Sequence, residues 1–375
     1  MKIHQFDPKL PNNAMPKLPL ELNLLDPQLL IQLNKTNIAL ATLNGHAHLI
    51  PNQKVLIEFS SIKEGVFSNQ VENIHTTIEE AFIAELSNNK KKMSKEIKET
   101  LHYKDAIFFG YEQIGRHQKI TIKDIITLNS LLLENEQGIV SSPHKRIVGS
   151  QGVVYTPPQW IEIIKDLIKN FEQVYNEFNE KREIDPLLKL PMLHYQFEAI
   201  HPFSDGNGRI GRILAVLYLV LHDKLTLPIL FLSESILLEK QQYYTFLSAI
   251  DRREKRALYD FTLRFLLLVE QQAYKTGIMI LRIEQLMKGT KKALKTNSKL
   301  AKIYSHELVD YLFTRPYYDI NGLTAMLRIH RNTASSYFAA LEEADLIKSI
   351  KIGREKYYYN PAFLAILKYG KEKKR

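Results

Sequence analysis

The sequence predicts a mainly α-helical protein with a β-hairpin near its middle and a winged helix-turn-helix domain at its C-terminal end. Residues 122–136 and 161–178 repeat apolar side chains every three or four positions, as amphipathic helices do. Between them, residues 138–160 carry β-branched residues, internal glycines and a closing pair of prolines, which favour a hairpin and a turn. Residues 303–367 follow the order helix, helix, helix, hairpin, which is typical of winged helix-turn-helix domains.

Length and composition limit the classes of function. The chain has 375 residues, 45% apolar residues, a net charge of +10 and no cysteine. This length is enough for two or three domains, and the lack of cysteine excludes disulfides, thiol catalysis and cysteine-bound zinc. The N-terminus has no long apolar core, and the apolar run 213–221 is too short to span a bilayer. We therefore expect a cytoplasmic protein without membrane attachment, whose charge suits either a nucleic acid or a nucleotide.

The chain divides into three predicted parts. Residues 1–110 form an N-terminal segment that is rich in proline and asparagine at first and is expected to be extended up to about residue 50. Residues 111–285 form a central helical domain, and residues 300–375 form the winged helix-turn-helix domain. The basic stretch 289–302 is expected to be a linker or an exposed helix, and the lone Trp160 is expected to pack in the core.

The strongest functional signal is the stretch HPFSDGNGRIGR at residues 201–212. It contains G-x-G-x-x-G, but no predicted strand precedes the first glycine, which argues against a dinucleotide-binding site. His194, Glu198 and His201 share one face of a predicted helix, but the zinc-protease pattern HExxH is absent, which argues against a metal site. The helix that follows is apolar on all sides and is therefore predicted to be buried.

The residue types of this stretch suit an anion site at a helix N-terminus. The first N–H groups of a helix have no partner in the helix and carry partial positive charge. Gly206 and Gly208 lack side chains, so phosphate oxygens can approach the backbone there. Arg209 and Arg212 are three residues apart on one helical face, where both can clamp terminal phosphates.

Two further side chains complete the predicted constellation. Asp205 would repel a phosphate directly, so it is better suited to hold a Mg²⁺ that bridges phosphates. His201 supplies the only base of the motif that works near neutral pH. The set predicts an enzyme that moves a phosphorus-centred group.

The stretch resembles the signature of the Fic (Fido) family, H-P-F-x-[DE]-G-N-G-R-x-x-R, at every fixed position. The resemblance extends to the surrounding helices, the hairpin that ends in YTPP and the downstream QQYYTFL. It implies a helical Fic domain in which a hairpin within residues 146–156 is a flap that aligns a target protein as an added edge strand. It also implies that AMP passes from ATP to a Ser, Thr or Tyr hydroxyl of a protein.

The resemblance implies a role for each matching position. His201 takes the proton from the target hydroxyl, and Asp205 holds Mg²⁺. The other positions contact ATP: Gly206, Asn207 and Gly208 line the anion hole, Arg209 and Arg212 grip the β- and γ-phosphates, and Tyr243 lies near the nucleoside. A tyrosine at position 243 is explained nearly as well by core packing.

A second motif, within FSSIKEGVF at residues 59–67, resembles the family's inhibitory pattern [ST]-x-x-x-E-[GN]. Ser60, Glu64 and Gly65 match it, on a predicted helix near residues 60–68 that precedes the catalytic domain. The resemblance implies that Glu64 pairs with Arg212 and withdraws it from the γ-phosphate. Whether the helix acts on its own chain or on a neighbour in a homodimer is open at this point.

Other functions are compatible with the sequence. Relatives of this family transfer other phosphate-containing groups or remove AMP, although the intact GNGR argues against the phosphotransferase branch. A different class is a DNA-binding regulator that acts through the C-terminal domain, with protein contact as the other use of that domain. The candidate DNA contacts begin the third helix and decorate the hairpin of that domain: Arg328, His330, Arg331, Asn332, Lys348, Lys351, Arg354 and Lys356. The sequence does not name the target protein, which includes the chain itself as a candidate.

Overall fold

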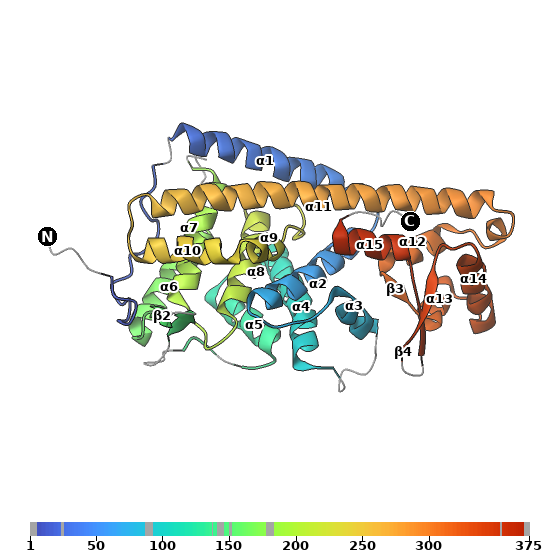
Figure 1. The fold of residues 1–375 in the computed structure, drawn as a ribbon, viewed down its shortest axis with the longest axis horizontal. Helices are drawn as coiled ribbons and strands as arrows, with labels where there is room; N and C mark the ends of the chain where they lie inside the picture. The colour runs from blue at the N-terminus through green and yellow to red at the C-terminus, as the bar shows by residue number, and fades with distance from the viewer. Residues whose placement is uncertain are drawn as a thin grey trace.

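The protein is an elongated, mainly helical molecule (Figure 1), and the computed structural model describes residues 6–23, 26–86, 93–136, 138–140, 146–149, 152–177, 184–352 and 355–370. The helices up to the signature motif are α1 (Pro27–Ala47), α2 (Gln53–Val71), α3 (Ile78–Leu86), α4 (Lys95–His117), α5 (Ile122–Leu133), α6 (Ile161–Tyr175) and α7 (Pro186–Ile200). The later helices are α8 (Asn207–Leu221), α9 (Ser233–Leu238), α10 (Lys240–Asp251), α11 (Ala257–Thr296), α12 (His306–Thr314), α13 (Ile320–Leu327), α14 (Arg331–Glu343) and α15 (Pro361–Tyr369). The strands are β1 (Ile147–Gly149), β2 (Gly152–Tyr155), β3 (Tyr317–Tyr318), β4 (Lys348–Ile352) and β5 (Glu355–Tyr359).

Helix α1 corrects the prediction of extended chain up to about residue 50. The Asp26 side chain caps the helix by accepting hydrogen bonds from the N–H groups of Gln28 and Leu29, and Pro27 occupies the first turn. The buried positions recur at helical spacing among polar ones and include Leu29, Leu40 and Leu43. The helical spacing of apolar residues was therefore present in the sequence, but the polar residues between them made it hard to recognise.

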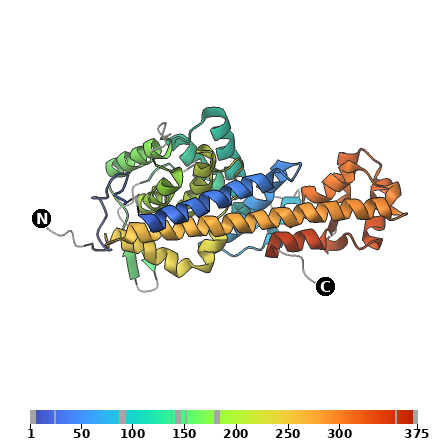
Figure 2. The ribbon, with the colours of Figure 1, turned by 90° about the horizontal axis from the view of Figure 1, so that it is seen from above.

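Helix α11 connects the two ends of the molecule. It runs for 40 residues and lies beside α1 over its first half, as Figures 1 and 2 both show. The basic stretch 289–302 continues this helix through Thr296 and then forms a 3-10 turn at Leu300–Lys302. Because Thr290 and Leu294 are buried, this stretch is a packed helix end rather than a free linker. The domain limits at 285 and 300 stay predictions.

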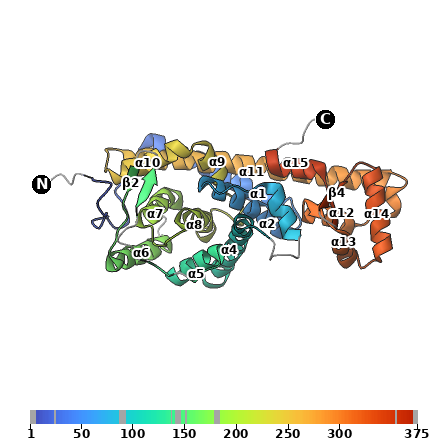
Figure 3. The same ribbon diagram turned by 60° about the horizontal axis from the view of Figure 1, so that its bottom comes forward.

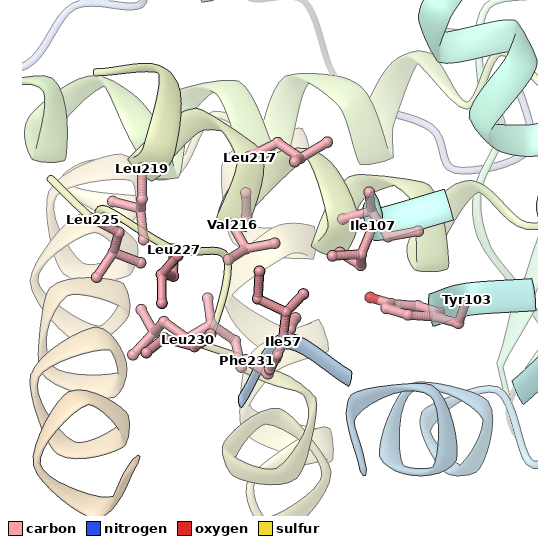
Figure 4. Packing of buried hydrophobic residues seen from close by; sticks show 14 of the residues in the cluster. Ile57, Tyr103, Ile107, Val216, Leu217, Leu219, Leu225, Leu227, Leu230 and Phe231 are labelled. Atoms are coloured by element: carbon pink, nitrogen blue, oxygen red, sulfur yellow. The ribbon is translucent and has the colours of Figure 1, made fainter. Parts of the chain in front are cut away.

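The core of the central domain surrounds α8. Helices α4 to α8 lie together (Figure 3), and every residue of α8 from Arg209 to Leu221 is buried. Figure 4 shows Ile57 of α2, Tyr103 and Ile107 of α4, and the α8 side chains Val216 and Leu217 gathered in this core. Truncating one such side chain to alanine costs about 2–5 kcal/mol. The prediction of a buried helix after the signature is confirmed, and its packing fixes the start of α8 in place.

The hairpin and the C-terminal domain complete the fold. Strands β1 and β2 pair antiparallel, as predicted for a hairpin within residues 146–156. In the C-terminal part, helices α12, α13 and α14 precede an antiparallel β4–β5 pair, and β3 and α15 are added to the predicted order. Arg354 lies outside the described residues. This part packs against α2 through the rings of Phe363 and Phe59, whose centroids are 5.1 Å apart.

Trp160 is not a core residue, contrary to the prediction. Its side chain is 64% exposed, and it occupies the N-cap of α6 with extended backbone angles. As the N-cap, Trp160 stands just before the first helical residue and is not part of the helical face on which Ile164 is buried.

Candidate active site

The signature forms a tight loop between α7 and α8. His201 ends α7 in the left-handed region with φ 52°, and Gly206 precedes α8 with φ 82°, which favours glycine. The Asn207 side chain holds the loop closed, because its oxygen accepts from the Phe203 N–H and its amide donates to the Phe203 carbonyl, both at 2.9 Å. The Asn207 side chain therefore shapes the loop. Its backbone N–H, in the first turn of α8, is the group of this residue that can bind an anion.

The N-terminus of α8 has the properties of an anion site. The N-cap of α8 is Gly206, which has no side chain to cap the helix, so within the described parts of the chain the N–H groups of the first turn are available to a ligand. The Asp205 side chain is 62% exposed and accepts a hydrogen bond of 2.6 Å from the Gly206 N–H. Asn129 of α5 donates to the Asp205 carbonyl at 3.0 Å and fixes this turn from the other side.

His201 lies at the edge of the same pocket in a defined tautomer. Its Nδ1 is 3.2 Å from the Glu198 carbonyl oxygen. A carbonyl only accepts, so Nδ1 carries the proton and Nε2 is the basic nitrogen of the neutral ring.

A pocket of about 990 Å³ joins these elements. This volume is at the upper end of the roughly 300–1,000 Å³ that small-molecule and cofactor sites span. Its lining comes from α2, the hairpin, α7, α8 and α10, and includes Glu72, Val148, Glu198, His201, Gly208, Arg212, Tyr243 and Tyr244. Tyr243 fits both interpretations of the sequence: it lines the pocket, and it is buried with its hydroxyl 2.7 Å from His194 Nε2. Burial, and then Arg212, lower the pKa of His194 to about 3, so that ring is neutral.

The two arginines of the signature have different surroundings. Arg209 is 1% exposed and pairs with Glu99 of α4, and its Nη2 lies 3.3 Å from Asp205 Oδ1. Its Nη1 also donates to Asn69 Oδ1 at 3.4 Å. Arg209 is therefore held between helices and, unlike Arg212, does not line the pocket.

Arg212 is bound to helix α2. Its Nε donates to Ser68 Oγ at 2.9 Å, and its Nη2 donates to the Ser68 carbonyl at 3.1 Å and to Glu72 Oε1 at 2.9 Å. A Cβ atom added to Gly208 would lie 2.6 Å from the same Glu72 oxygen, so the carboxylate lies directly over the start of α8. Burial works against the charge on Arg212, but Glu72, Tyr103 and Glu198 raise its pKa.

The prediction that Glu64 pairs with Arg212 is wrong, because the Glu64 carboxylate bonds to a different residue. Glu64 is buried on α2 and accepts hydrogen bonds from Ser233, at 3.2 Å from the backbone N–H and more closely from Oγ. Burial raises the pKa of Glu64 to about 7, against the Ser233 hydrogen bond. Gly65 serves packing, since an added Cβ would lie 2.7 Å from the Thr100 carbonyl of α4. Ser60 is also buried, four residues before Glu64 on the same helix.

The sequence contains a signal that identifies Glu72, which was missed. Ser68, Glu72 and Asn73 match the pattern [ST]-x-x-x-E-[GN] as well as Ser60, Glu64 and Gly65 do. The two matches are offset by eight positions, and only the glutamate of the later one hydrogen-bonds to Arg212. Asn129 and Glu99, by contrast, come from distant helices and leave no local signal in the sequence.

Two further observations concern metals and membranes. Within the described parts of the chain, no group of three or more His, Cys, Asp or Glu side chains is arranged to hold a metal ion. No helix of the described residues is long and apolar enough to cross a bilayer.

Comparison with known families assigns the chain. The model "Fic/DOC family" matches residues 119–219, "Fic/DOC family N-terminal" matches 30–112, and "Protein adenylyltransferase SoFic-like, C-terminal domain" matches 286–363. The chain therefore contains a Fic/DOC domain, preceded by the N-terminal domain of that family and followed by a SoFic-like C-terminal domain. A crystal structure of a Fic family protein from Desulfovibrio desulfuricans has the same fold, with a TM-score of 0.51 and 18% identity over 92% of this chain and 98% of that one.

Curated relatives match over shorter regions. A Fido domain-containing protein of Dictyostelium discoideum is 37% identical over 73 residues, which are 20% of this chain and 48% of that protein. A protein adenylyltransferase of Caenorhabditis elegans is 32% identical over 105 residues, which are 26% of this chain and 19% of that protein. A probable protein adenylyltransferase of Aquifex aeolicus is 40% identical over 63 residues, or 17% of this chain and 18% of that protein. The matched region thus covers less than half of each of these relatives.

Proposed function

We propose that this protein is a nucleotidyltransferase that moves AMP from ATP to a Ser, Thr or Tyr hydroxyl of a protein and releases diphosphate. The observation that carries the proposal is that the His201 imidazole and the uncapped N-terminus of α8 line one pocket of about 990 Å³. The Fic/DOC domain and the names of two relatives, protein adenylyltransferase and probable protein adenylyltransferase, support the same reaction.

The residues divide the chemical work. His201 Nε2 takes the proton of the target hydroxyl while the hydroxyl oxygen bonds to the α-phosphorus. The bond from that phosphorus to the oxygen bridging to the β-phosphate breaks, and diphosphate leaves. Backbone N–H groups at Asn207 and Gly208 stabilise the charge that develops on the phosphate oxygens. Gly206, whose own N–H donates to Asp205, leaves room for the phosphates to approach. The hairpin edge aligns the target chain, which requires little of its sequence.

The chain also fits a magnesium ion. One exposed carboxylate, Asp205, stands beside the anion site, and Mg²⁺ is commonly bound by one or two carboxylates together with substrate phosphates. When bound, the ion neutralises phosphate charge. We assign Arg209 the task of holding the Asp205 turn, since its guanidinium contacts Asp205 and Glu99. Arg212 and Tyr243 are the side chains assigned to ATP.

We further propose that Glu72, rather than Glu64, holds the enzyme inactive. Its carboxylate neutralises Arg212 and lies over Gly208, where the phosphates of ATP would bind. A negative group there repels the triphosphate and leaves Arg212 unavailable to it. The contact forms within one chain, so inhibition does not require a neighbour.

Mass spectrometry tests the proposed reaction. The parent and Glu72→Gly proteins are incubated with ATP and Mg²⁺, with and without a cell extract, and intact proteins are weighed. We expect AMP adducts with Glu72→Gly, on the protein itself or on extract proteins, and far fewer with the parent. Gain of phosphate alone would favour a phosphoryl transferase. Loss of AMP from a previously modified substrate, without any gain, would favour AMP removal.

A second candidate function is DNA binding by the C-terminal domain. Arg331, Asn332 and Ser335 are exposed along the start of α14, where a recognition helix contacts bases. Two basic side chains of the hairpin are neutralised, because Lys356 pairs with Glu342 and Lys348 with Asp345. Binding to duplex DNA that weakens steeply with salt would support this function, and no binding at low salt would remove it. The other uses that we propose for this domain are contact with a protein and formation of a homodimer. Sedimentation at micromolar concentration tests homodimer formation.

A further inference from the structure

The contacts of Arg212 create a problem for any active state. Its three hydrogen bonds all go to α2, two to Ser68 and one to Glu72, and the side chain is almost fully buried. If Glu72 leaves so that ATP can bind, the guanidinium loses its carboxylate partner. A buried charge without a partner is strongly destabilised. Until the terminal phosphates of ATP reach it, the free Arg212 therefore needs a second carboxylate nearby.

Glu198 is placed to supply it. This residue is in the last turn of α7 and lines the same pocket. It lies against α8 next to Arg212, since a Cβ added to Gly211 would be 2.5 Å from Glu198 Oε1. That oxygen is buried and has no hydrogen-bond partner among the described residues. Arg212 and Glu198 are close enough to stabilise each other's charged forms.

We propose that Glu198 is a positioning residue, which takes over the Arg212 guanidinium when Glu72 is displaced and holds it for the terminal phosphates of ATP. This inference rests on the proposed function and deepens it. A guanidinium has five N–H donors in a planar fork, so one edge can hold a carboxylate while another binds a phosphate. Glu198 belongs to α7 rather than α2, so it stays beside Arg212 when the end of α2 moves.

The charges around Glu198 support an exchange between the two carboxylates. The pocket there is lined by Arg212 of α8, Glu72 at the end of α2, Tyr243 and Tyr244 of α10, and His201 at the end of α7. His194 of α7 bonds to the Tyr243 hydroxyl. Burial raises the pKa of Glu198 to about 7; Arg212 opposes this shift, and Glu72 adds to it. When Glu72 is present, Glu198 is thus partly protonated at neutral pH. Removing Glu72 removes the repulsion, so the pKa of Glu198 falls and its carboxylate is ionised when Arg212 needs it.

Calorimetry with ATP and Mg²⁺ tests the inference independently of AMP transfer. We compare Glu72→Gly with the double variant Glu72→Gly/Glu198→Gln, and with Glu72→Gly/Glu162→Gln as a control on the exposed face of α6. We expect the Glu198→Gln change to weaken ATP binding about tenfold, with the KM of transfer raised and kcat within about twofold. The control should bind as Glu72→Gly does.

The pH profile separates positioning from a structural role. Affinity of Glu72→Gly for ATP should fall as pH drops through the pKa of Glu198, which lies below 7 once Glu72 is gone, because protonated Glu198 no longer holds Arg212. This loss should be absent from the double variant with Glu198→Gln. Glu198→Asp, which keeps a carboxylate, should restore the pH dependence. Equal affinity and equal pH profiles with and without the Glu198→Gln change would overturn the inference alone. Failure of Glu72→Gly to bind ATP at any pH would overturn the proposed function and the inference together.

Discussion

Two segments of helix α2 match one sequence pattern and have opposite surroundings. Glu64 and Glu72 are eight residues apart, which is about two turns plus 80° of rotation around a helix with 3.6 residues per turn. Glu64 consequently faces α9 and bonds to Ser233, whereas Glu72 faces α8 and pairs with Arg212. The pattern specifies a glutamate on a helix, but the helix packing decides what that glutamate meets.

The two carboxyl groups also differ in how easily they can move. Glu64 is 1% exposed and bonds to neutral donors, and its raised pKa reflects that burial. The Glu72 side chain is 34% exposed at the end of α2, and its partner is a full charge. A partly exposed group at a helix end is more accessible to a competing anion than a fully buried one. The comparison therefore assigns packing to Glu64 and control of the pocket to Glu72.

The largest expected effect comes from removing the base. His201→Ala in the Glu72→Gly background should lower AMP incorporation at least a hundredfold, since a general base contributes about 10²–10⁴ in rate. ATP affinity by calorimetry should change less than about threefold. If AMP transfer persists, a group other than His201 acts as the base. If ATP binding is lost too, the imidazole is structural.

A smaller effect is expected from the two serines of the matching segments. Ser68→Ala removes the hydrogen bond to Arg212 Nε, worth about 1 kcal/mol, and should raise AMP incorporation about fivefold. Ser60→Ala is the matched control at the same place in the other segment and should leave the rate within about twofold. Equal rates for both variants, measured with labelled ATP, would contradict the assignment of the second segment to Arg212.

The smallest effect on activity is expected from Glu64→Gln, whose consequence is on stability. Because the pKa of Glu64 rises from 4.5 to about 7 on folding, its contribution to stability is complete below pH 4.5 and is lost as pH rises through 7. Over this window the unfolding free energy of the parent should fall by about 3 kcal/mol relative to the variant. Urea unfolding at pH 4.5 and pH 8 measures the difference. A constant difference at both pH values would show that folding leaves the pKa of Glu64 unchanged.

The sequence predicted the features that depend on local pattern. The helical class, the hairpin and the buried helix after the signature follow from apolar spacing and from glycine and proline. Helix α1 was missed although its capping by Asp26 is local, because polar residues interrupt the row of buried side chains. The partners of the signature arginines were not predictable, since Glu99, Ser68 and Glu72 reach them only through the packing of α2 and α4 on α8. To choose between Glu64 and Glu72, one must know which face of α2 packs against α8. A match to the sequence pattern does not give that orientation.

AMP incorporation from labelled ATP by Glu72→Gly and Glu64→Gln, side by side with the parent, tests the account most directly. We predict at least a tenfold rise for Glu72→Gly, about 1.4 kcal/mol off the barrier, and a rate within about twofold of the parent for Glu64→Gln. A rise with Glu64→Gln and none with Glu72→Gly would contradict it.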